Sequence, residues 1–327
     1  MTAAGPARPA AADHTPDPAA QPAAAPEAAP VAPEVAVVTV NFDSAVVLEP
    51  FLASVGPAAQ QVRAAVYVAD NKPGSTQRPE IERIVAAHGA TYLPMTGNLG
   101  YGHAINAVVA TLPPATEFVL VSNPDVVLAA GAIDVLVATL REFDDVGAVG
   151  PKILEPDGSA YPSARAVPSI RNGIGHALFA NVWPGNPWTR SYRNEIGDHP
   201  VRRDAGWLSG SCFLIRRTAF EQLGGFDTGY FMYFEDVDLG YRLGSHGWRN
   251  LYEPAAEALH TGAHSTTGES ERMLVAHHDS AKRFLAKKYS GPLLWPVRAT
   301  LSFGLSLRSL VVRRRNRRLA DEARRRG

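Results

Sequence analysis

The sequence predicts an α/β protein whose central sheet is mainly parallel and carries helices on both faces. Short apolar runs rich in β-branched residues, typical of strands buried on both sides, recur at 35–40, 65–69, 91–94 and 117–122. Stretches with a helical spacing of apolar residues separate them, at 45–55, 79–88 and 103–109. Strands and helices that alternate in this way are typical of a parallel sheet with covered faces.

The second half of the chain is less regular. Residues 147–153 and 207–215 have strand character, and 217–223 has the pattern of a helix that ends at two glycines. Residues 160–205 are rich in Pro, Gly, Trp and Arg, which is typical of a long functional loop region. A further strand is expected at 251–259.

Composition limits the classes of function. The chain has 327 residues and 46% hydrophobic composition, enough to bury one large core or two modest ones. Lys+Arg and Asp+Glu both number 32, so the net charge favours neither a nucleic acid nor an acidic partner. The single cysteine, Cys212, excludes an internal disulfide and a multi-cysteine zinc site, and its apolar neighbours favour a core position.

Both ends of the chain differ in composition from the middle, which indicates three segments. Residues 1–34 contain 14 Ala and 8 Pro and no apolar stretch of a signal peptide, so we expect a disordered leader. Residues 35–290 would form the globular domain. Residues 291–327 would form an apolar helix and a tail that holds eight arginines between Arg313 and Arg326.

The apolar stretch 293–312 is expected to lie on a membrane surface rather than to cross the bilayer. Arg298 and Arg308 lie within it, and arginines are costly at a bilayer centre. A helix in the interface, with the arginine tail on anionic headgroups, accommodates both features. The alternative is a helix that caps the domain or mediates homo-oligomerisation, followed by a solvated basic tail.

Polar side chains collect where the predicted strands end. Because ligands of open α/β sheets bind at the carboxyl ends of strands, these side chains are expected to line one pocket. They are Asn41, Asp43, Asp70, Asn71, Asn98, Asn123 and Asp125. Residues 97–106 also follow a strand and open a helix, where glycines let backbone N–H groups approach a diphosphate, although the spacing is not the dinucleotide fingerprint.

Two further features can carry chemistry, and each has a simpler alternative. Asp125 can bind a divalent cation, and His260 would complete the coordination of that cation. The alternative is that Asn123-Pro124-Asp125 forms a turn, since it also has the composition of one. The run 231–238 sets three acids behind aromatic residues. Apolar surroundings raise a carboxylate's pKa and make it a proton acceptor, whereas acids in the first turn of a helix can simply complement its dipole.

In this order along the chain, these motifs resemble the family 2 glycosyltransferases of the GT-A fold, and among them the bacterial rhamnosyltransferases. The resemblance spans about residues 35–290. The motifs that carry it are Val38–Asn41, Val68–Asn71, Asn98–Gly100, Asn123–Asp125, Gly210-Ser211, Phe234–Asp236 and His260.

The resemblance implies a role for each matching residue. Asp236 would be the catalytic base, and Asp125 and His260 would bind Mg²⁺ or Mn²⁺, with Asn123 standing where the family has the first acid of its metal motif. Asp70 would read a pyrimidine base. The expected nucleotide-sugar-binding residues are Asn41, Asp43, Asp70, Asn71, Asn98, Gly100 and Asn123, and the expected acceptor-binding residues are Trp207, Ser209, Gly210 and Glu235.

The function implied is an inverting, metal-dependent transfer of L-rhamnose from dTDP-β-L-rhamnose to N-acetylglucosaminyl-diphospho-polyprenol. This reaction belongs to assembly of the arabinogalactan linker of a cell wall, and the enzyme would sit peripherally on the cytoplasmic face of the membrane. The alternatives are another donor, such as a galactofuranosyl or glucosyl nucleotide, and a nucleotide-sugar-binding module that has lost catalysis. Nucleic-acid binding rests on the arginine tail alone and is not expected.

Overall fold

The computed structural model describes residue 1 and residues 32–169, 201–262, 270–296, 299–300 and 304 of the chain. The predicted leader 1–34 therefore lies almost wholly outside the described residues. The same holds for most of the predicted helix 293–312 and for the arginine tail.

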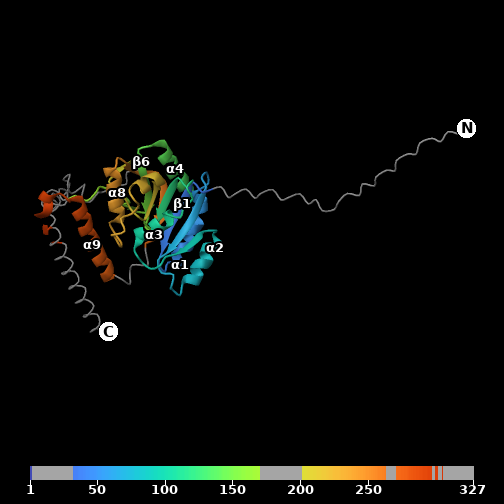
Figure 1. Ribbon diagram of the computed structural model, residues 1–327, viewed down its shortest axis with the longest axis horizontal. Coiled ribbons are helices and arrows are strands. Elements are labelled where there is room, and N and C mark those ends of the chain that lie inside the picture. The colour runs from blue at the N-terminus through green and yellow to red at the C-terminus, as the bar shows by residue number, and fades with distance from the viewer. Residues whose placement is uncertain (2–31, 170–200, 263–269, 297–298, 301–303, 305–327) are drawn as a thin grey trace. The chain divides into compact units, whose positions relative to one another are not determined.

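The central sheet runs in the order β3-β2-β1-β4-β11-β6-β12-β5, with β7 added to β6 and β9 added to β12 (Figure 1). Strands β3, β2, β1 and β4 are mutually parallel, as are β6 and β12, whereas β11 is antiparallel to both of its neighbours. A separate ribbon pairs β8 with β10. The bounds are β1 Val35–Asn41, β2 Ala64–Asp70, β3 Thr91–Pro94, β4 Phe118–Ser122, β5 Val126–Leu128, β6 Val146–Leu154, β7 Ala160–Tyr161, β8 Ala164–Arg165, β9 Arg203–Ala205, β10 Trp207–Leu208, β11 Cys212–Arg216 and β12 Arg249–His260.

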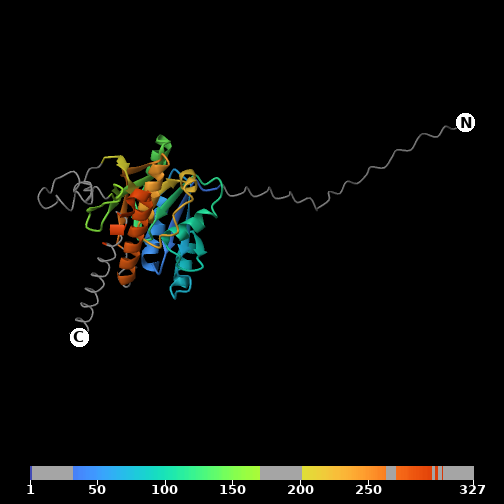
Figure 2. The same cartoon turned by 60° about the vertical axis from the view of Figure 1, so that its left-hand side comes forward.

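Helices cover both faces of this sheet, as predicted. Alternate residues of a strand face opposite sides of the sheet, and because both sets are apolar in the buried strands, each side needs a covering layer. In β1, Val35 and Val37 pack with α1, α2 and α4, whereas Ala36 and Val38 pack with α3, α7 and α8. In Figure 2 the long helix α9, coloured orange-red, lies in front of the sheet, and in Figure 1 it lies on the far side of α8 from β1. The bounds are α1 Ala45–Ala58, α2 Arg78–Ala87, α3 Tyr101–Val109, α4 Ala132–Glu142, α7 Arg217–Gln222, α8 Glu235–Ser245 and α9 Ser270–Lys288, with a 3₁₀ turn at Pro292–Leu294.

The predicted strand 207–215 is wrong as a single element. It forms β10 and β11, which belong to different sheets, and a turn interrupts it at residues 209–211. In this turn the Cys212 N–H donates to the Ser209 carbonyl at 3.3 Å, and the hydroxyls of Ser209 and Ser211 lie 2.8 Å apart. Cys212 itself is buried in the core, as expected.

Helix α9, which the sequence did not predict, is fastened to α8 by a buried ring and by an ion pair. Phe284 is fully buried beside Tyr230 and Val237. The Lys287 ammonium lies 2.7 Å from the Asp238 carboxylate, which is also fully buried. These contacts hold α9 against the helix that carries the acidic run.

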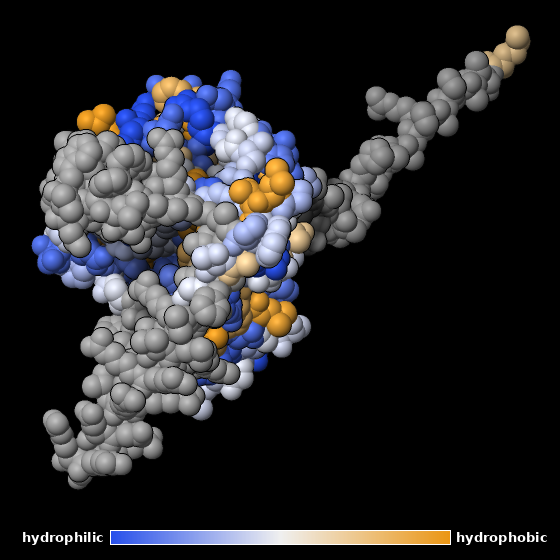
Figure 3. Space-filling view, turned by 90° about the vertical axis from the view of Figure 1, so that its left-hand side faces the viewer, coloured by the Kyte–Doolittle hydropathy of each residue, from blue (hydrophilic) through white to orange (hydrophobic). Residues whose placement is uncertain are grey.

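The described residues after α9 expose apolar side chains. Leu293 is 91% exposed and Trp295 is 64% exposed. Figure 3, which views the side where α8 and α9 lie in Figure 1, shows separate hydrophobic patches among hydrophilic residues. Within the part of the chain that the structure describes, no helix has the length and apolar character needed to span a bilayer.

Gly100 is a position where a side chain is expected to be costly. Its φ of 107° lies in the left-handed half of conformational space, and an added Cβ would overlap the Phe231 carbonyl. We expect Gly100→Ala to lower the free energy of unfolding by about 2 kcal/mol or more. Gly97→Ala is the matched control, because its Cβ would meet no atom within 4 Å. Equal midpoints of the two variants in urea unfolding would contradict this assignment.

Candidate active site

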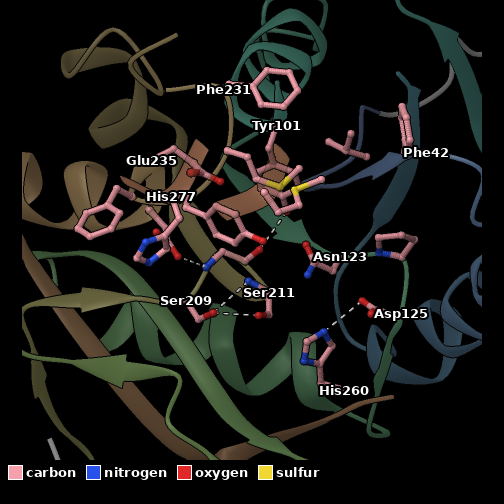
Figure 4. A pocket seen from close by; sticks show the side chains of 18 of the residues that line it. Phe42, Tyr101, Asn123, Asp125, Ser209, Ser211, Phe231, Glu235, His260 and His277 are labelled. Carbon is pink, nitrogen blue, oxygen red and sulfur yellow. Dashed lines mark hydrogen bonds and ion pairs between the residues drawn. The ribbon is translucent and has the colours of Figure 1, made fainter. Parts of the chain in front are cut away.

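A cavity of about 880 Å³ opens at the carboxyl ends of β1 and β4 and extends to the start of α8. It is large enough for a small-molecule ligand. Figure 4 shows Glu235 and His277 on one side of it and Asp125 and His260 on the other, with Asn123 and Ser211 between them in this view. The predicted site residues that line it are Asp43, Asn71, Asn98, Asn123, Asp125, Trp207, Ser209, Gly210, Glu235, Asp236 and His260.

Antiparallel pairing of β5 with β12 brings Asp125 and His260 together. His260 is the partner of Val126 in the ladder, so it lies beside the residue that precedes β5. The Thr261 N–H and hydroxyl donate to the Asp125 carbonyl at 2.9 and 3.0 Å and fix this arrangement. His260 Nε2 lies 3.2 Å from Asp125 Oδ1, and the carboxylate raises the pKa of His260 against the opposing effect of burial.

The Asp125–His260 pair has the donor set of a divalent-cation site completed by substrate. Asp125 Oδ2 is buried and lacks a hydrogen-bond partner among the residues that the structure describes, and the one polar contact given for His260 Nε2 is Asp125 Oδ1. Unpaired buried polar atoms are uncommon and call for a ligand, ion or water. No group of three or more His, Cys, Asp or Glu within those residues could hold a metal. A cation here would therefore take further oxygen ligands from phosphate or water, as Mg²⁺ commonly does.

Asp236 lies in the first turn of α8, where the backbone conformation is strained. Tyr233 and Phe234, just before it, both have φ of 66°, which is unusual for bulky residues. The Asp236 carboxylate accepts N–H bonds from Gly210 at 2.9 Å and from Val237 at 2.8 Å. Burial raises the pKa of Asp236, while these two bonds oppose the rise. The result is an oriented carboxylate on the cavity wall.

Glu235 is a buried carboxyl group with one oxygen that has no partner among the described residues. It is 7% exposed, and its Oε2 makes no hydrogen bond within the described residues. Burial, together with the neighbouring Asp236 carboxylate, raises the pKa of Glu235 to about 8. At neutral pH this side chain is therefore mainly a neutral hydrogen-bond donor. The helix dipole explains neither its burial nor its missing partner, so the run is more than a capped helix end.

The residues expected on the nucleotide side form two polar clusters. Asp43 pairs with Lys72; burial would raise the pKa of Asp43, but the hydrogen bonds from Lys72 and Ser75 outweigh it and lower that pKa. Asn71 donates to Asn98 Oδ1 at 3.4 Å and to the Gly100 carbonyl at 3.3 Å. Both clusters present polar atoms at strand ends, as the sequence predicted.

Asn41, Asp70 and Gly100 are not among the residues that line the cavity. Asp70 is fully buried and accepts hydrogen bonds from Asn41 Nδ2 at 2.9 Å, from the Lys72 N–H at 3.0 Å and from the Tyr92 hydroxyl at 2.5 Å. Gly100 lies against the Phe231 carbonyl. These three residues lie outside the cavity lining, and direct reading of a base by Asp70 stays a prediction.

Sequence reasoning missed several residues of the cavity. Tyr101 donates its hydroxyl to the Gly210 carbonyl at 2.9 Å and so ties α3 to the turn that holds Asp236. Arg165 and Tyr161 come from short strands inside the region taken for a loop, and His277 comes from α9. Arginine and tyrosine within the polar-aromatic stretch after residue 160 were the available signal for the first two.

The chain matches the family model described as "Glycosyltransferase like family 2" over residues 32–278. This range covers most of the 327 residues, and the chain belongs to that family. The expectation that the protein is a glycosyltransferase is thereby confirmed.

Two relatives and one solved structure define the likeness further. The N-acetylglucosaminyl-diphospho-decaprenol L-rhamnosyltransferase of Mycobacterium tuberculosis is 46% identical over 295 residues, covering 86% of this chain and 95% of that protein. The rhamnosyltransferase WbbL of Escherichia coli is 28% identical over 207 residues, covering 59% and 72% respectively. The mannosyltransferase PcManGT of Pyrobaculum calidifontis, solved with GDP-Man and Mn²⁺, superposes with a TM-score of 0.53 at 17% identity, covering 84% of this chain and 70% of that one. This last likeness concerns the fold alone, and the predicted GT-A fold is confirmed.

Glu235 is expected to make the stability of the protein depend on pH. Its pKa in the folded state is about 8, above the ordinary 4.5, so the folded protein keeps the proton at pH values where the unfolded chain loses it. The contribution of the protonated group to the free energy of unfolding is therefore complete below about pH 4.5 and is lost as the pH rises through about 8. Glutamine does not titrate, so the free energy of unfolding of Glu235→Gln should rise relative to that of the wild type by a few kcal/mol between about pH 5 and about pH 9. Urea unfolding of both proteins across this range checks it. A constant difference between the two curves would show that Glu235 does not titrate there.

Proposed function

We propose that the chain transfers L-rhamnose, with inversion, from dTDP-β-L-rhamnose to N-acetylglucosaminyl-diphospho-polyprenol. The observation that carries the proposal is that one cavity contains both an oriented carboxylate, Asp236, and a contacting acid–histidine pair, Asp125 and His260, which we propose binds a divalent cation. An inverting transfer requires these two functions: removal of a proton and neutralisation of a departing diphosphate. The 46% identity to the mycobacterial enzyme favours its acceptor class and its sugar.

The proposed reaction is a direct displacement at the anomeric carbon. An acceptor hydroxyl oxygen attacks that carbon while the bond from the carbon to the donor phosphate breaks. The hydroxyl proton passes to the Asp236 carboxylate, and the nucleoside diphosphate leaves with the electron pair of the broken bond. Attack on the face opposite the leaving group turns a β-linked rhamnosyl donor into an α-L-rhamnoside.

The other residues of the cavity orient this step. Asp236 keeps its position because Gly210 and Val237 bond its two oxygens separately. Glu235, neutral near pH 7, can donate a hydrogen bond to an acceptor oxygen beside Asp236. Asp125 and His260 would hold Mg²⁺ or Mn²⁺, which when bound offsets the charge that develops on the diphosphate.

The lipid part of the acceptor motivates a peripheral position on the cytoplasmic face of the membrane. Phe231 at the cavity is 41% exposed, and Leu293 and Trp295 after α9 are exposed as well. Residues 291–327, whose tail carries eight arginines between Arg313 and Arg326, would contact anionic headgroups. The domain of residues 35–290 would then work at the surface where a polyprenyl-linked sugar resides.

A donor panel tests the substrate assignment. With a short-chain N-acetylglucosaminyl-diphospho-prenol as acceptor, we expect transfer from dTDP-rhamnose and not from UDP-glucose or UDP-galactofuranose. EDTA should abolish transfer, and added Mg²⁺ or Mn²⁺ should restore it. Transfer from the UDP-sugars without transfer from dTDP-rhamnose would instead favour another polysaccharide transferase of the same fold. A lack of transfer from every donor, with nucleotide-sugar binding retained, would indicate a module without catalysis.

Asp236→Asn tests the proposed base. The amide cannot take a proton, so we expect kcat to fall about 100-fold or more while the Kd for the donor, measured by calorimetry, stays the same. Asp238→Asn is the contrasting control on the same helix. The Asp238 carboxylate pairs with Arg242 at 2.6 Å and with Lys287 at 2.7 Å. This change should therefore lower the melting temperature while kcat falls much less than in Asp236→Asn. Appreciable turnover by Asp236→Asn would rule out the base.

Flotation with liposomes tests the membrane assignment. The full chain should float with vesicles that contain anionic lipid, and deletion of residues 291–327 should abolish flotation. Binding should also weaken as salt rises, since the attraction to headgroups is electrostatic. Unchanged flotation after the deletion would contradict this role and leave domain capping or oligomerisation for the segment.

A further inference from the structure

Arg165 is the one Lys or Arg among the described residues that line the cavity. Four carboxylates share this lining: Asp43, Asp125, Glu235 and Asp236. An arginine in such surroundings would ordinarily form an ion pair with one of them. Within the described part of the chain, however, Arg165 forms no ion pair with a carboxylate, so its charge can pair with an anionic ligand.

Aromatic rings and one backbone carbonyl hold the Arg165 side chain in place. Its guanidinium carbon lies 5.6 Å from the Trp207 ring centroid and 5.8 Å from that of Tyr161. The Nε–H group donates to the Pro162 carbonyl at 2.7 Å. The two terminal nitrogens make no hydrogen bond among the residues that the structure describes. A guanidinium oriented in this way keeps its two-pronged edge free for an anion, which suits phosphate better than a single point charge does.

The place of Arg165 in the fold puts it on the acceptor side. It lies on β8, directly opposite Trp207 of β10 in the ribbon, and β10 leads into the turn at Gly210 that holds Asp236. Its positive charge acts on Asp236 without forming an ion pair with it, and this charge lowers the pKa of that carboxyl. Asp125 and His260, which would serve the donor's diphosphate, come from the central sheet, beside β5 and β12, and the Tyr161 ring contacts both His260 and Arg165.

We propose that Arg165 binds the diphosphate of the lipid-linked acceptor and so positions the acceptor sugar against Asp236. This inference rests on the proposed function, since it concerns the second substrate of the same reaction. The donor nucleotide brings the same chemistry, a diphosphate, into the same cavity. The experiment therefore separates the two sources.

Kinetics and direct binding of Arg165→Gln test the proposal. The KM for a short-chain N-acetylglucosaminyl-diphospho-prenol should rise about 10- to 100-fold, as expected for the loss of a charged hydrogen bond, with little change in the KM for dTDP-rhamnose. By calorimetry, the affinity for a short-chain prenyl diphosphate should fall by a similar factor, and the affinity for dTDP should stay the same. Arg165→Lys should lose less affinity than Arg165→Gln, because lysine keeps the positive charge. It should not reach the wild-type value, because lysine lacks the two-pronged edge of the guanidinium.

A neighbouring arginine provides the control. Arg203 is bonded to the same ribbon through the Ala164 carbonyl at 3.0 Å, but it does not line the cavity. Arg203→Gln should leave both KM values and both affinities unchanged. Unchanged acceptor and prenyl-diphosphate affinities in Arg165→Gln would overturn the inference, and so would a loss confined to dTDP. Failure of the wild type to use the lipid acceptor would contradict the proposed function itself, which is a distinct outcome.

Discussion

The backbone of Gly210 joins two helices that contribute to the site. Its N–H donates to Asp236 at the start of α8, and its carbonyl accepts from the Tyr101 hydroxyl at the start of α3, both at 2.9 Å. The same turn is tied to the end of β4, where the Asn123 N–H donates to the Ser211 carbonyl at 2.9 Å. A shift of this one turn would move the carboxylate, the start of α3 and the loop before Asp125 together. The geometry of the cavity therefore depends on it.

The site holds several groups that cost stability, and the neighbouring structure offsets that cost. Glu235 and Asp125 each have a buried oxygen without a partner in the described residues, and Tyr233 and Phe234 adopt left-handed backbone conformations. The third acid of the run behaves differently, because Asp238 is fully buried and paired with two cations. It anchors α8 to α9, whereas Asp236 accepts two backbone N–H bonds and Glu235 keeps one oxygen without a partner among the described residues. One short acidic run thus combines an anchor with two groups that face the cavity.

The sequence predicted what depends on local pattern, and it missed what depends on long-range pairing. The strand ends of β1, β2 and β4 were predictable because each strand is a continuous apolar run followed by polar residues. The turn at residues 209–211 was missed because apolar residues flank it closely enough to read as one strand. Arg165 was missed because β8 has only two residues, too few for any periodicity. The burial of Asp70 depends on Tyr92 from the next strand, which pattern alone does not reveal.

Charge balance gives a reason for two cationic positions in the proposed reaction. Its lining offers four carboxylates to substrates that, in the proposed reaction, each bring a diphosphate. Without compensation, like charges would repel both substrates and raise the pKa of Asp236 further. A cation at Asp125 and His260 would neutralise one diphosphate, and Arg165 would neutralise the other. The two positions come from different strand pairs, β5 with β12 and β8 with β10, and the Tyr161 ring contacts both His260 and Arg165, so in the proposed reaction the two diphosphates would bind side by side. Binding side by side would bring the donor carbon and the acceptor hydroxyl together near Asp236, which is the geometry that a direct displacement needs.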